Sequence, residues 1–138
     1  MSTDPLMFSR LGRYALRTVA IVTGADQRVT GKTLSAETGI PSAYQSKVLR
    51  QLVEADILSA KKGHHGGFAL AHPAETIRLA DVLDSVGALP AGGACVFGWG
   101  QCSASKPCPL HNKWSTLSEN VMNWAEQTTL ADLTAQSA

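Results

Sequence analysis

The 138-residue sequence lacks any apolar run long enough to span a bilayer, and it lacks the pattern of a signal peptide. Residues 1–13 contain no apolar segment after their charged residues. We therefore expect no membrane partner and a cytoplasmic location, where the reducing environment keeps cysteines as thiols. The length predicts one domain, with room for an appended dimerisation element.

Cysteine is scarce, and its three copies fall in one stretch of the chain. Cys95, Cys102 and Cys108 follow the pattern C-x6-C-x5-C, and His111 comes three residues after the last of them. The odd number disfavours a disulfide framework. The stretch is also rich in glycine and proline, and segments of this composition rarely form part of a packed core. Sulfur ligands beside an imidazole in such a segment indicate a metal or iron–sulfur site.

Three other interpretations of these cysteines are open. Three thiolates and one imidazole could hold zinc, although zinc sites commonly include a shorter C-x2–4-C pair, and gaps of six and five residues favour a larger group. A thiol redox switch is the second, and cysteines without a special role are the third. Pro109 suits the first position of a helix, which predicts Cys108 at the helix cap and on the same face as His111.

An acid–base or nucleophile set beside the cysteines is also missing. Asp81 and Asp84 are best interpreted as the solvated face of a helix. We therefore expect no enzyme. A small iron–sulfur electron carrier is the alternative from another class of protein, but a carrier has no need for the basic surface described next.

Positive charge is concentrated in the N-terminal half of the chain, although the net charge of the whole chain is only +1. Residues 1–72 hold nine Lys and Arg against five Asp and Glu, and residues 73–138 hold three against six. The basic half is where a polyanion such as DNA would bind.

Two helices joined by a tight turn are predicted in that basic half, after a first amphipathic helix over 8–23. Thr30 is expected to cap the first of the pair, which ends near Thr38. The second follows the turn Gly39-Ile40-Pro41 and is expected to begin with Ser42 as its cap. This arrangement is typical of a helix-turn-helix.

The second helix of the pair is expected to have a buried stripe and an exposed polar face. The buried stripe comprises Tyr44, Val48, Leu52 and Ala55, with Leu34 and Ile40 beside it. The exposed face comprises Gln45, Lys47 and Arg50, with Ser42 and Ser46 at its leading end. Small polar and basic side chains are the groups that proteins use on base edges and phosphates.

Residues 57–60 and 68–71 alternate as two short strands, and the glycine-rich segment KKGHHGG joins them. Gly63, Gly66 and Gly67 permit the positive φ angles of a hairpin tip. The cationic or hydrogen-bonding groups there are Lys61, Lys62, His64 and His65. A basic hairpin directly after a helix-turn-helix predicts a winged helix, so the fold class is mainly α with a small β-wing. Solvated histidines without a function are the alternative for His64 and His65.

A short helix is predicted over 77–89 and a longer one over 110–128, one on each side of the cysteines. The longer helix carries an apolar seam with heptad spacing. Its members are Leu110, Trp114, Leu117, Val121, Trp124 and Thr128. The length of the seam and its two tryptophans favour packing against a second copy, and packing against its own domain is the alternative. The chain then divides into a DNA-binding domain (1–88), a cysteine segment (89–109) and a dimerisation helix with its tail (110–138).

Several segments together resemble the IscR/NsrR-type iron–sulfur regulators over nearly the whole chain. The matching segments are GRYAL (12–16), GIPSAYQSKVLRQL (39–52), KKGHHGGFAL (61–70), IRLADVL (77–83), the cysteine pattern with CPLH, and TTLADL (128–133). The resemblance implies a homodimeric winged-helix transcription regulator that binds double-stranded DNA at a palindromic operator. It also implies an iron–sulfur cluster that reports cluster status, redox state or nitric oxide.

The resemblance assigns roles residue by residue. The expected cluster ligands are Cys95, Cys102, Cys108 and His111. Ser42, Tyr44 and Lys47 match the recognition helix, and Lys62 matches a basic wing residue near the minor groove. The gap of six residues departs from the family pattern. Arg10 stands where some relatives place an aspartate ligand, which strengthens the histidine and favours 2Fe-2S, with 4Fe-4S possible.

Overall fold

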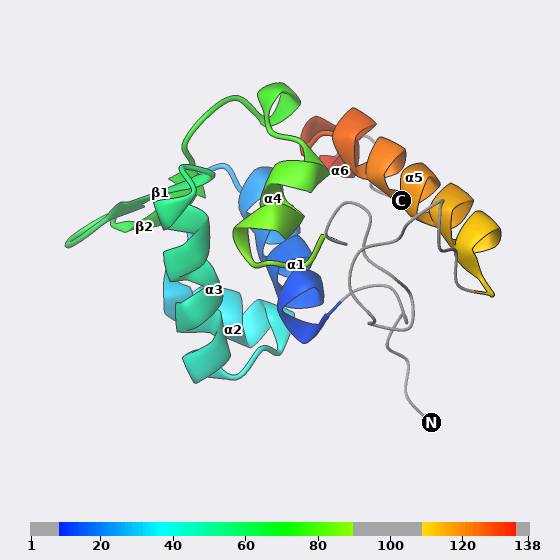
Figure 1. The fold of residues 1–138 in the computed structure, drawn as a ribbon. Helices are drawn as coiled ribbons and strands as arrows, with labels where there is room; N and C mark the ends of the chain where they lie inside the picture. Colours follow the sequence, from blue (N-terminus) through cyan, green and yellow to red (C-terminus); the bar gives the residue numbers. More distant parts are fainter. Residues whose placement is uncertain (1–8, 90–108, 135–138) are drawn as a thin grey trace.

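The computed structural model describes residues 9–89 and 109–134, and its fold is the mainly helical winged helix that the sequence predicts (Figure 1). Within these ranges the only sheet is a two-stranded antiparallel hairpin. The elements in chain order are α1 (Arg10–Gly24), α2 (Gly31–Thr38), α3 (Ser42–Glu54), β1 (Leu58–Lys61), β2 (Gly67–Leu70), the 3-10 turn η1 (Ala74–Thr76), α4 (Leu79–Ser85), α5 (His111–Gln127) and α6 (Ala131–Thr134). No helix of the described part is both long and apolar enough to cross a membrane.

Helix α1 is the common support of the fold, because α2, α3, α4 and α6 all pack on it. The side chain of Ser9 caps the helix by accepting a hydrogen bond from the N–H of Gly12 at 3.1 Å. Small and β-branched residues recur on its buried face, which lets neighbouring helices approach closely. These residues are Gly12, Ala15, Thr18, Val19 and Val22.

The closest approach on α1 is at Gly12. A Cβ added there would lie 2.7 Å from the Cβ of Ala88, which follows α4. Glycine is therefore needed at this position for space, since its backbone is an ordinary helical one. The contact fastens the end of the α4 segment to the start of α1.

The two helices of the helix-turn-helix, α2 and α3, follow in the predicted order, but the cap predicted for α3 is wrong. Thr30 caps α2 by accepting from the N–H of Thr33 at 3.1 Å, and Gly39 ends α2 in the left-handed conformation with φ +75°. Ser42, however, is the first residue of α3 and not its cap. Pro41 occupies the cap position because its extended backbone already presents its carbonyl to the N–H of Gln45, at 2.9 Å.

The wing is the antiparallel pair β1–β2, with Leu58 opposite Leu70 and Ala60 opposite Phe68. Phe68 also forms an isolated antiparallel bridge with Val29, which places the segment before α2 beside the hairpin. Gly63 and Gly67 take positive φ angles as predicted, but Gly66 does not. A Cβ on Gly66 would lie 2.4 Å from the carbonyl oxygen of Lys61, so glycine serves there to make room.

Helix α4 begins at Leu79, two residues later than predicted, because the residues before it pair with the end of α5. The N–H of Leu79 donates to Thr128 O at 2.8 Å, and the N–H of Leu130 donates to Ile77 O at 2.9 Å. An isolated bridge between Arg78 and Thr129 lies between these two bonds. This pairing attaches the C-terminal end of α5 to the segment that begins α4.

Asp81 is predicted to be only a solvated residue of a helix face, but its carboxylate forms hydrogen bonds with Arg78 at the start of α4. Its carboxylate accepts from the backbone N–H of Arg78 at 3.0 Å and from the Arg78 guanidinium at 3.0 Å. Partial burial alone would raise the pKa of Asp81, but these hydrogen bonds and the nearby charge outweigh it and lower the pKa below its ordinary value. The stabilisation by Asp81 is therefore present above that ordinary value and is lost as the pH falls through the lowered pKa.

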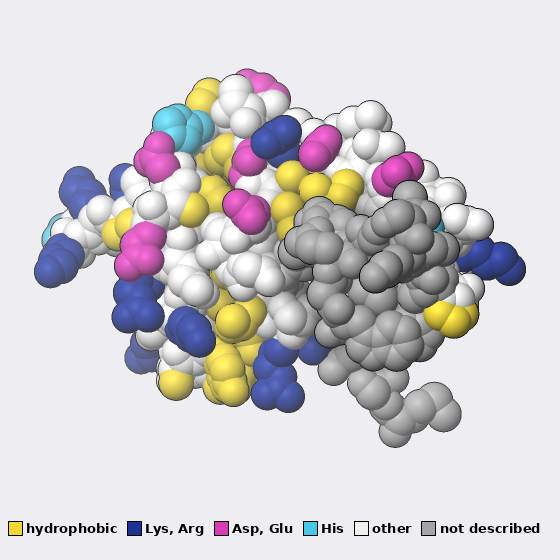
Figure 2. All heavy atoms as spheres, in the orientation of Figure 1, with side chains coloured by type: hydrophobic (Ala, Val, Ile, Leu, Met, Phe, Trp, Pro, Cys, Tyr) yellow, Lys and Arg dark blue, Asp and Glu magenta, His cyan; other side chains and the backbone are white. Residues whose placement is uncertain are grey.

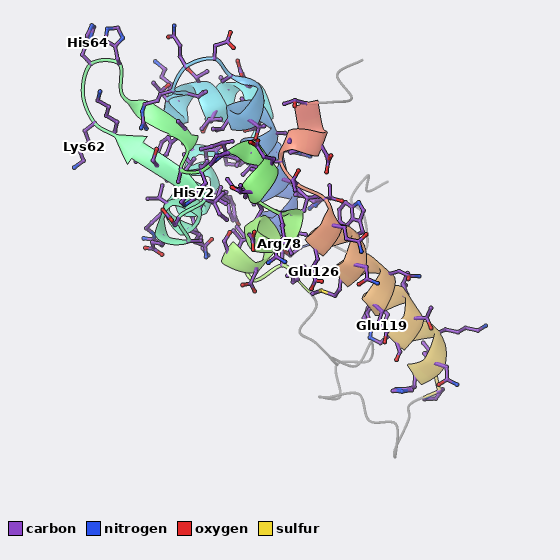
Figure 3. The ribbon with its side chains drawn as sticks, turned by 90° about the horizontal axis from the view of Figure 1, so that it is seen from above. Lys62, His64, His72, Arg78, Glu119 and Glu126 are labelled. Carbon is purple, nitrogen blue, oxygen red and sulfur yellow. The ribbon has the colours of Figure 1, made fainter. Side chains whose placement is uncertain are left out.

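Helix α5 extends away from the rest of the molecule (Figures 1 and 3). It begins at His111, so the prediction that Pro109 opens the helix and Cys108 caps it is wrong. Leu110 is its cap, and Leu110 O accepts the first helical hydrogen bond, from the N–H of Trp114 at 2.8 Å. Ala125, near its C-terminal end, is the one residue of α5 that is buried.

We expect Gly12→Ala to lower the free energy of unfolding, although alanine is normally better than glycine in a helix by about 1 kcal/mol. The overlap with Ala88 should cost about 1–3 kcal/mol and outweigh that gain. The matched control is Gly24→Ala in the same helix, where nothing lies within 4 Å of the new Cβ and no loss is expected. Urea denaturation measures both variants, and Ala88→Gly should restore the Gly12→Ala variant. Equal effects at the two glycines would contradict the packing argument.

Candidate nucleic-acid interface

The exposed face of α3 carries most of the polar side chains predicted for it. Ser42, Ser46, Lys47 and Arg50 are exposed on this helix. The strand β1 packs against α3, so the wing lies beside the helix (Figure 1). Figure 2 shows Lys and Arg side chains gathered mostly over the wing and the α3 side of the molecule. The structure thus places two separate predicted elements on one cationic side.

Gln45 is the exception, because it is buried with only 1% of its surface exposed. On the helical wheel it lies about 20° from Leu52, in the middle of the buried face. Its side-chain amide donates to the hydroxyl of Thr18 on α1 at 3.0 Å and accepts from the hydroxyl of Thr38 on α2 at 3.0 Å. The prediction that Gln45 faces DNA is therefore wrong.

Tyr44, which the sequence predicts in the buried stripe of α3, is exposed in the structure. It is 39% exposed rather than buried, and Ala55 at the other end of the predicted stripe is exposed too. The Tyr44 ring packs edge-to-face on Tyr14 of α1, with the ring centroids 5.8 Å apart. These two positions lie at the margin of the buried face, whose centre is taken by Gln45, Leu52 and their neighbours.

Two arginines of α1 join this aromatic pair. The guanidinium of Arg10 lies over the Tyr44 ring at 5.9 Å, and that of Arg17 lies over the Tyr14 ring at 5.9 Å. Such cation–π contacts hold a guanidinium in place and leave its charge available to an anion. The first helix therefore adds two exposed cations beside the start of α3. We name these four residues the arginine–tyrosine ladder.

The wing tip presents the predicted groups to solvent. Lys61, Lys62, His64 and His65 are all exposed. Figure 3 shows Lys62 and His64 at the end of the hairpin, away from the helices. His65 takes a positive φ of 59°, and its ring packs against that of His64 with the centroids 4.0 Å apart.

Arg28 positions the wing, and sequence reasoning missed it. Its guanidinium donates to the carbonyl oxygens of Ser59 at 3.0 Å and Gly67 at 3.1 Å, and to the Ser59 hydroxyl at 3.1 Å. One side chain thus ties both strands of the wing to the segment before α2. Because a single arginine in a loop has no periodicity, no sequence signal could have found this role.

The predicted metal ligands fall almost entirely outside the described residues. Cys95, Cys102 and Cys108 all lie in the range 90–108, while His111 is the first residue of α5. The Nδ1 atom of His111 is buried and has no hydrogen-bond partner among the residues that the structure describes. A buried imidazole nitrogen of this kind fits a metal ligand, since it needs an electron-pair acceptor or a hydrogen bond. In 9–89 and 109–134, no three His, Cys, Asp or Glu side chains are grouped to hold a metal ion.

The seam of α5 lies largely uncovered within one chain. Leu110 and Leu117 are each 46% exposed and Trp124 is 44% exposed, while Trp114 and Val121 are partly buried. The last seam member, Thr128, pairs with the segment before α4 by accepting a hydrogen bond from the N–H of Leu79, and packing of the other seam residues against a second copy stays a prediction.

The winged helix with its basic recognition helix and wing defines a protein of the transcription-regulator class. The chain belongs to the Rrf2 family, since the family model described as "Rrf2: Iron-dependent Transcriptional regulator" matches residues 8–136. This confirms the resemblance to the IscR/NsrR-type regulators at the level of the family. The family is one of transcriptional regulators rather than enzymes.

Individual relatives agree with this assignment. The HTH-type transcriptional regulator IscR of Cereibacter sphaeroides is 31% identical in an alignment 139 positions long that covers 93% of this chain and 86% of that protein. The solved structure of CymR, the global cysteine regulator of B. subtilis, superimposes with a TM-score of 0.79 at 18% identity, over 97% of this chain and 100% of that one. T. potens IscR gives a TM-score of 0.73 at 18% identity, over 94% and 90% of the two chains. At these identities the two structures show a shared fold alone.

We expect Arg28→Met to loosen the wing without unfolding the helices, because the wing loses three hydrogen bonds while the core is untouched. Hydrogen exchange of the β1 and β2 amides should accelerate roughly tenfold, while exchange in α1 stays unchanged. The matched control is Lys32→Met, which removes an exposed cation from α2 and leaves the three Arg28 hydrogen bonds to the wing in place. Wing amides that exchange at the same rate in both variants would contradict this role.

Proposed function

We propose that this regulator reads double-stranded DNA with the exposed face of α3 and that the wing and the arginine–tyrosine ladder hold the phosphate backbone on either side. The observation that carries the proposal is that these three elements adjoin one another. The strand β1 packs against α3, Arg10 of the ladder lies over Tyr44 of α3, and Figure 2 shows Lys and Arg side chains over the wing and the α3 side. Ser42, Tyr44, Ser46 and Lys47 stand at the leading half of α3, which is the part of a recognition helix that reaches base edges.

The wing supports contacts at the neighbouring groove. Lys61, Lys62, His64 and His65 lie at its exposed tip, and Arg28 holds the hairpin against the helix-turn-helix. Lysine contacts to phosphates position a protein without reading sequence, so specificity must come mainly from α3. Arg50, further along α3, is exposed and suited to a backbone phosphate.

Two copies of the chain are proposed to associate through α5. The exposed apolar seam of Leu110, Leu117 and Trp124 supports this, because an apolar helix face left in water is normally covered by a partner. A two-fold dimer presents two recognition helices and fits a palindromic operator, with half-sites about 34 Å apart.

We further propose that Cys95, Cys102, Cys108 and His111 hold an iron–sulfur cluster, with 2Fe-2S favoured over 4Fe-4S. The buried and unpartnered Nδ1 of His111 supports the histidine as a ligand. A bound cluster would supply sensitivity to iron supply, redox state or nitric oxide. The segment that would hold the cluster follows Ala88, which contacts Gly12 of α1, and leads into α5, whose C-terminal end pairs with residues 77–79.

The thiol-redox switch and the zinc site are the competing proposals for the same cysteines. Both use the same donor atoms, so only the bound metal and the thiol count separate them. A small iron–sulfur electron carrier is not favoured, because the exposed basic face of α3 and the wing would have no purpose in it.

We expect Lys47→Ala and Lys62→Ala to weaken DNA binding and to reduce the slope of log affinity against log salt by about 1 each, as the loss of one phosphate contact predicts. Fluorescence anisotropy over a salt series measures this, with DNA from the region upstream of the gene. Lys113→Ala, which removes an exposed lysine of α5, is the control and should leave the slope unchanged. Equal slopes in all three variants and wild type would contradict the proposed DNA face.

We expect protein purified without oxygen to be coloured and to contain iron and sulfide. Cys102→Ala should abolish the cluster, leave a folded dimer and lower operator affinity on the order of 30–150-fold. His111→Ala should give a labile or spectrally shifted cluster with a smaller loss. Absorbance spectra, metal analysis and anisotropy with operator DNA measure these effects.

The same experiment separates the competing proposals. Colourless protein with one zinc per chain supports the zinc site, and metal-free protein that loses free thiols under mild oxidant supports the thiol switch. If Cys102→Ala binds the operator like wild type under all redox conditions, the cysteine segment is no switch.

A further inference from the structure

The recognition helix is joined to the core by a buried polar contact. Gln45 and Thr18 are the two polar residues of the described part that are buried in the otherwise apolar core. Gln45 belongs to α3 and Thr18 belongs to α1, on the buried faces where the two helices pack. A buried amide needs hydrogen-bond partners, so its position is set by geometry as well as by packing.

The hydrogen bonds of Gln45 reach the helices α1 and α2. Its Nε2 donates to the Thr18 hydroxyl, which in turn donates to Tyr14 O at 2.8 Å. Its Oε1 accepts from the Thr38 hydroxyl, which also lies 2.6 Å from Leu34 O and shares its single hydrogen between the two acceptors.

The contact also includes the turn between α2 and α3. The N–H of Ile40 donates to the Thr38 hydroxyl at 3.2 Å. One glutamine on α3 is therefore connected to α1, to the last turn of α2 and to the turn itself.

Apolar packing alone is non-directional, so it permits small rotations and slides of one helix over another. The amide of Gln45 permits only the arrangement in which both of its ends are paired. Its sequence neighbours Tyr44 and Ser46 are among the exposed residues in the leading half of α3. A rotation that breaks the Gln45 bonds would therefore also move the side chains that face DNA.

We propose that Gln45 is a positioning residue that sets the rotation and register of α3, and that discrimination between DNA sequences depends on it without any contact from Gln45 to DNA. The inference rests on the proposed DNA-binding function and adds the residue that gives it specificity. Phosphate contacts tolerate small movements of a helix, whereas hydrogen bonds to base edges do not. Loss of the amide should therefore reduce sequence discrimination more than overall affinity.

Replacement of Gln45 by an apolar residue separates this role from a merely stabilising one. In Gln45→Leu and Gln45→Met, the hydroxyls of Thr18 and Thr38 keep their carbonyl acceptors Tyr14 O and Leu34 O. Exchange of a buried polar contact for apolar packing is often neutral or stabilising when no partner is left unsatisfied. We therefore expect both variants to melt at or above the temperature of the wild type.

The experiment compares affinity for a selected operator with affinity for a random duplex at one salt concentration, for full-length protein prepared in the same way. The operator is first found by selection from random DNA with the wild-type chain. In both Gln45 variants the ratio of the two affinities should fall about tenfold, the size expected for one misplaced base contact. Affinity for the random duplex and its salt slope should stay as in wild type.

Gln51→Leu is the matched control, because it also removes a side-chain amide from α3. The side-chain oxygen of Gln51 has no hydrogen-bond partner among the described residues. Its ratio should equal that of the wild type. If either Gln45 variant folds and keeps the wild-type ratio, or if neither variant folds, the positioning role is overturned. If the wild-type chain itself shows no preference for any selected sequence, the proposed DNA-reading function fails instead.

Discussion

The packing of α1 against its neighbours is the constraint on which the rest of the structure depends. Its buried face is made of small and β-branched residues, so α3, α4 and α6 can all rest on one short helix. Leu52 from α3, Leu83 from α4 and Leu130 from the turn before α6 are fully buried around it. Helices far apart in the sequence are thereby brought into one core.

Directional hydrogen bonds then decide how α3 and the wing, the elements proposed to face DNA, are placed on that core. Arg28 determines the placement of the wing, since it bonds to residues 31 and 39 positions further along the chain. Gln45 connects the recognition helix to two other helices. Apolar burial supplies most of the stability of such a domain, whereas these few polar contacts select one arrangement among several with similar burial.

The C-terminal part of the chain is anchored at one end and extends at the other. Residues 128–130 pair with 77–79, next to the Arg78–Asp81 ion pair, and Ala125 is buried nearby. Figure 3 shows Arg78 beside Glu126 at this junction and Glu119 further out along α5. A change at the start of α5 therefore acts at a distance from the point where the helix is held. This geometry suits the proposed role of α5 as the link between the cysteine segment and the DNA-binding face.

The sequence by itself determined the order and type of the elements, because apolar periodicity, the Thr30 cap and the Gly39 stop are local signals. It also predicted which segments are basic, and the family follows from motifs in the chain. Only the tertiary structure decided that Gln45 points inward and Tyr44 outward, since adjacent helix positions differ by about 100° and the neighbouring helices choose which of them is covered. The roles of Arg28 and of the Gly12–Ala88 contact likewise arise between residues far apart in the chain, where sequence periodicity carries no information.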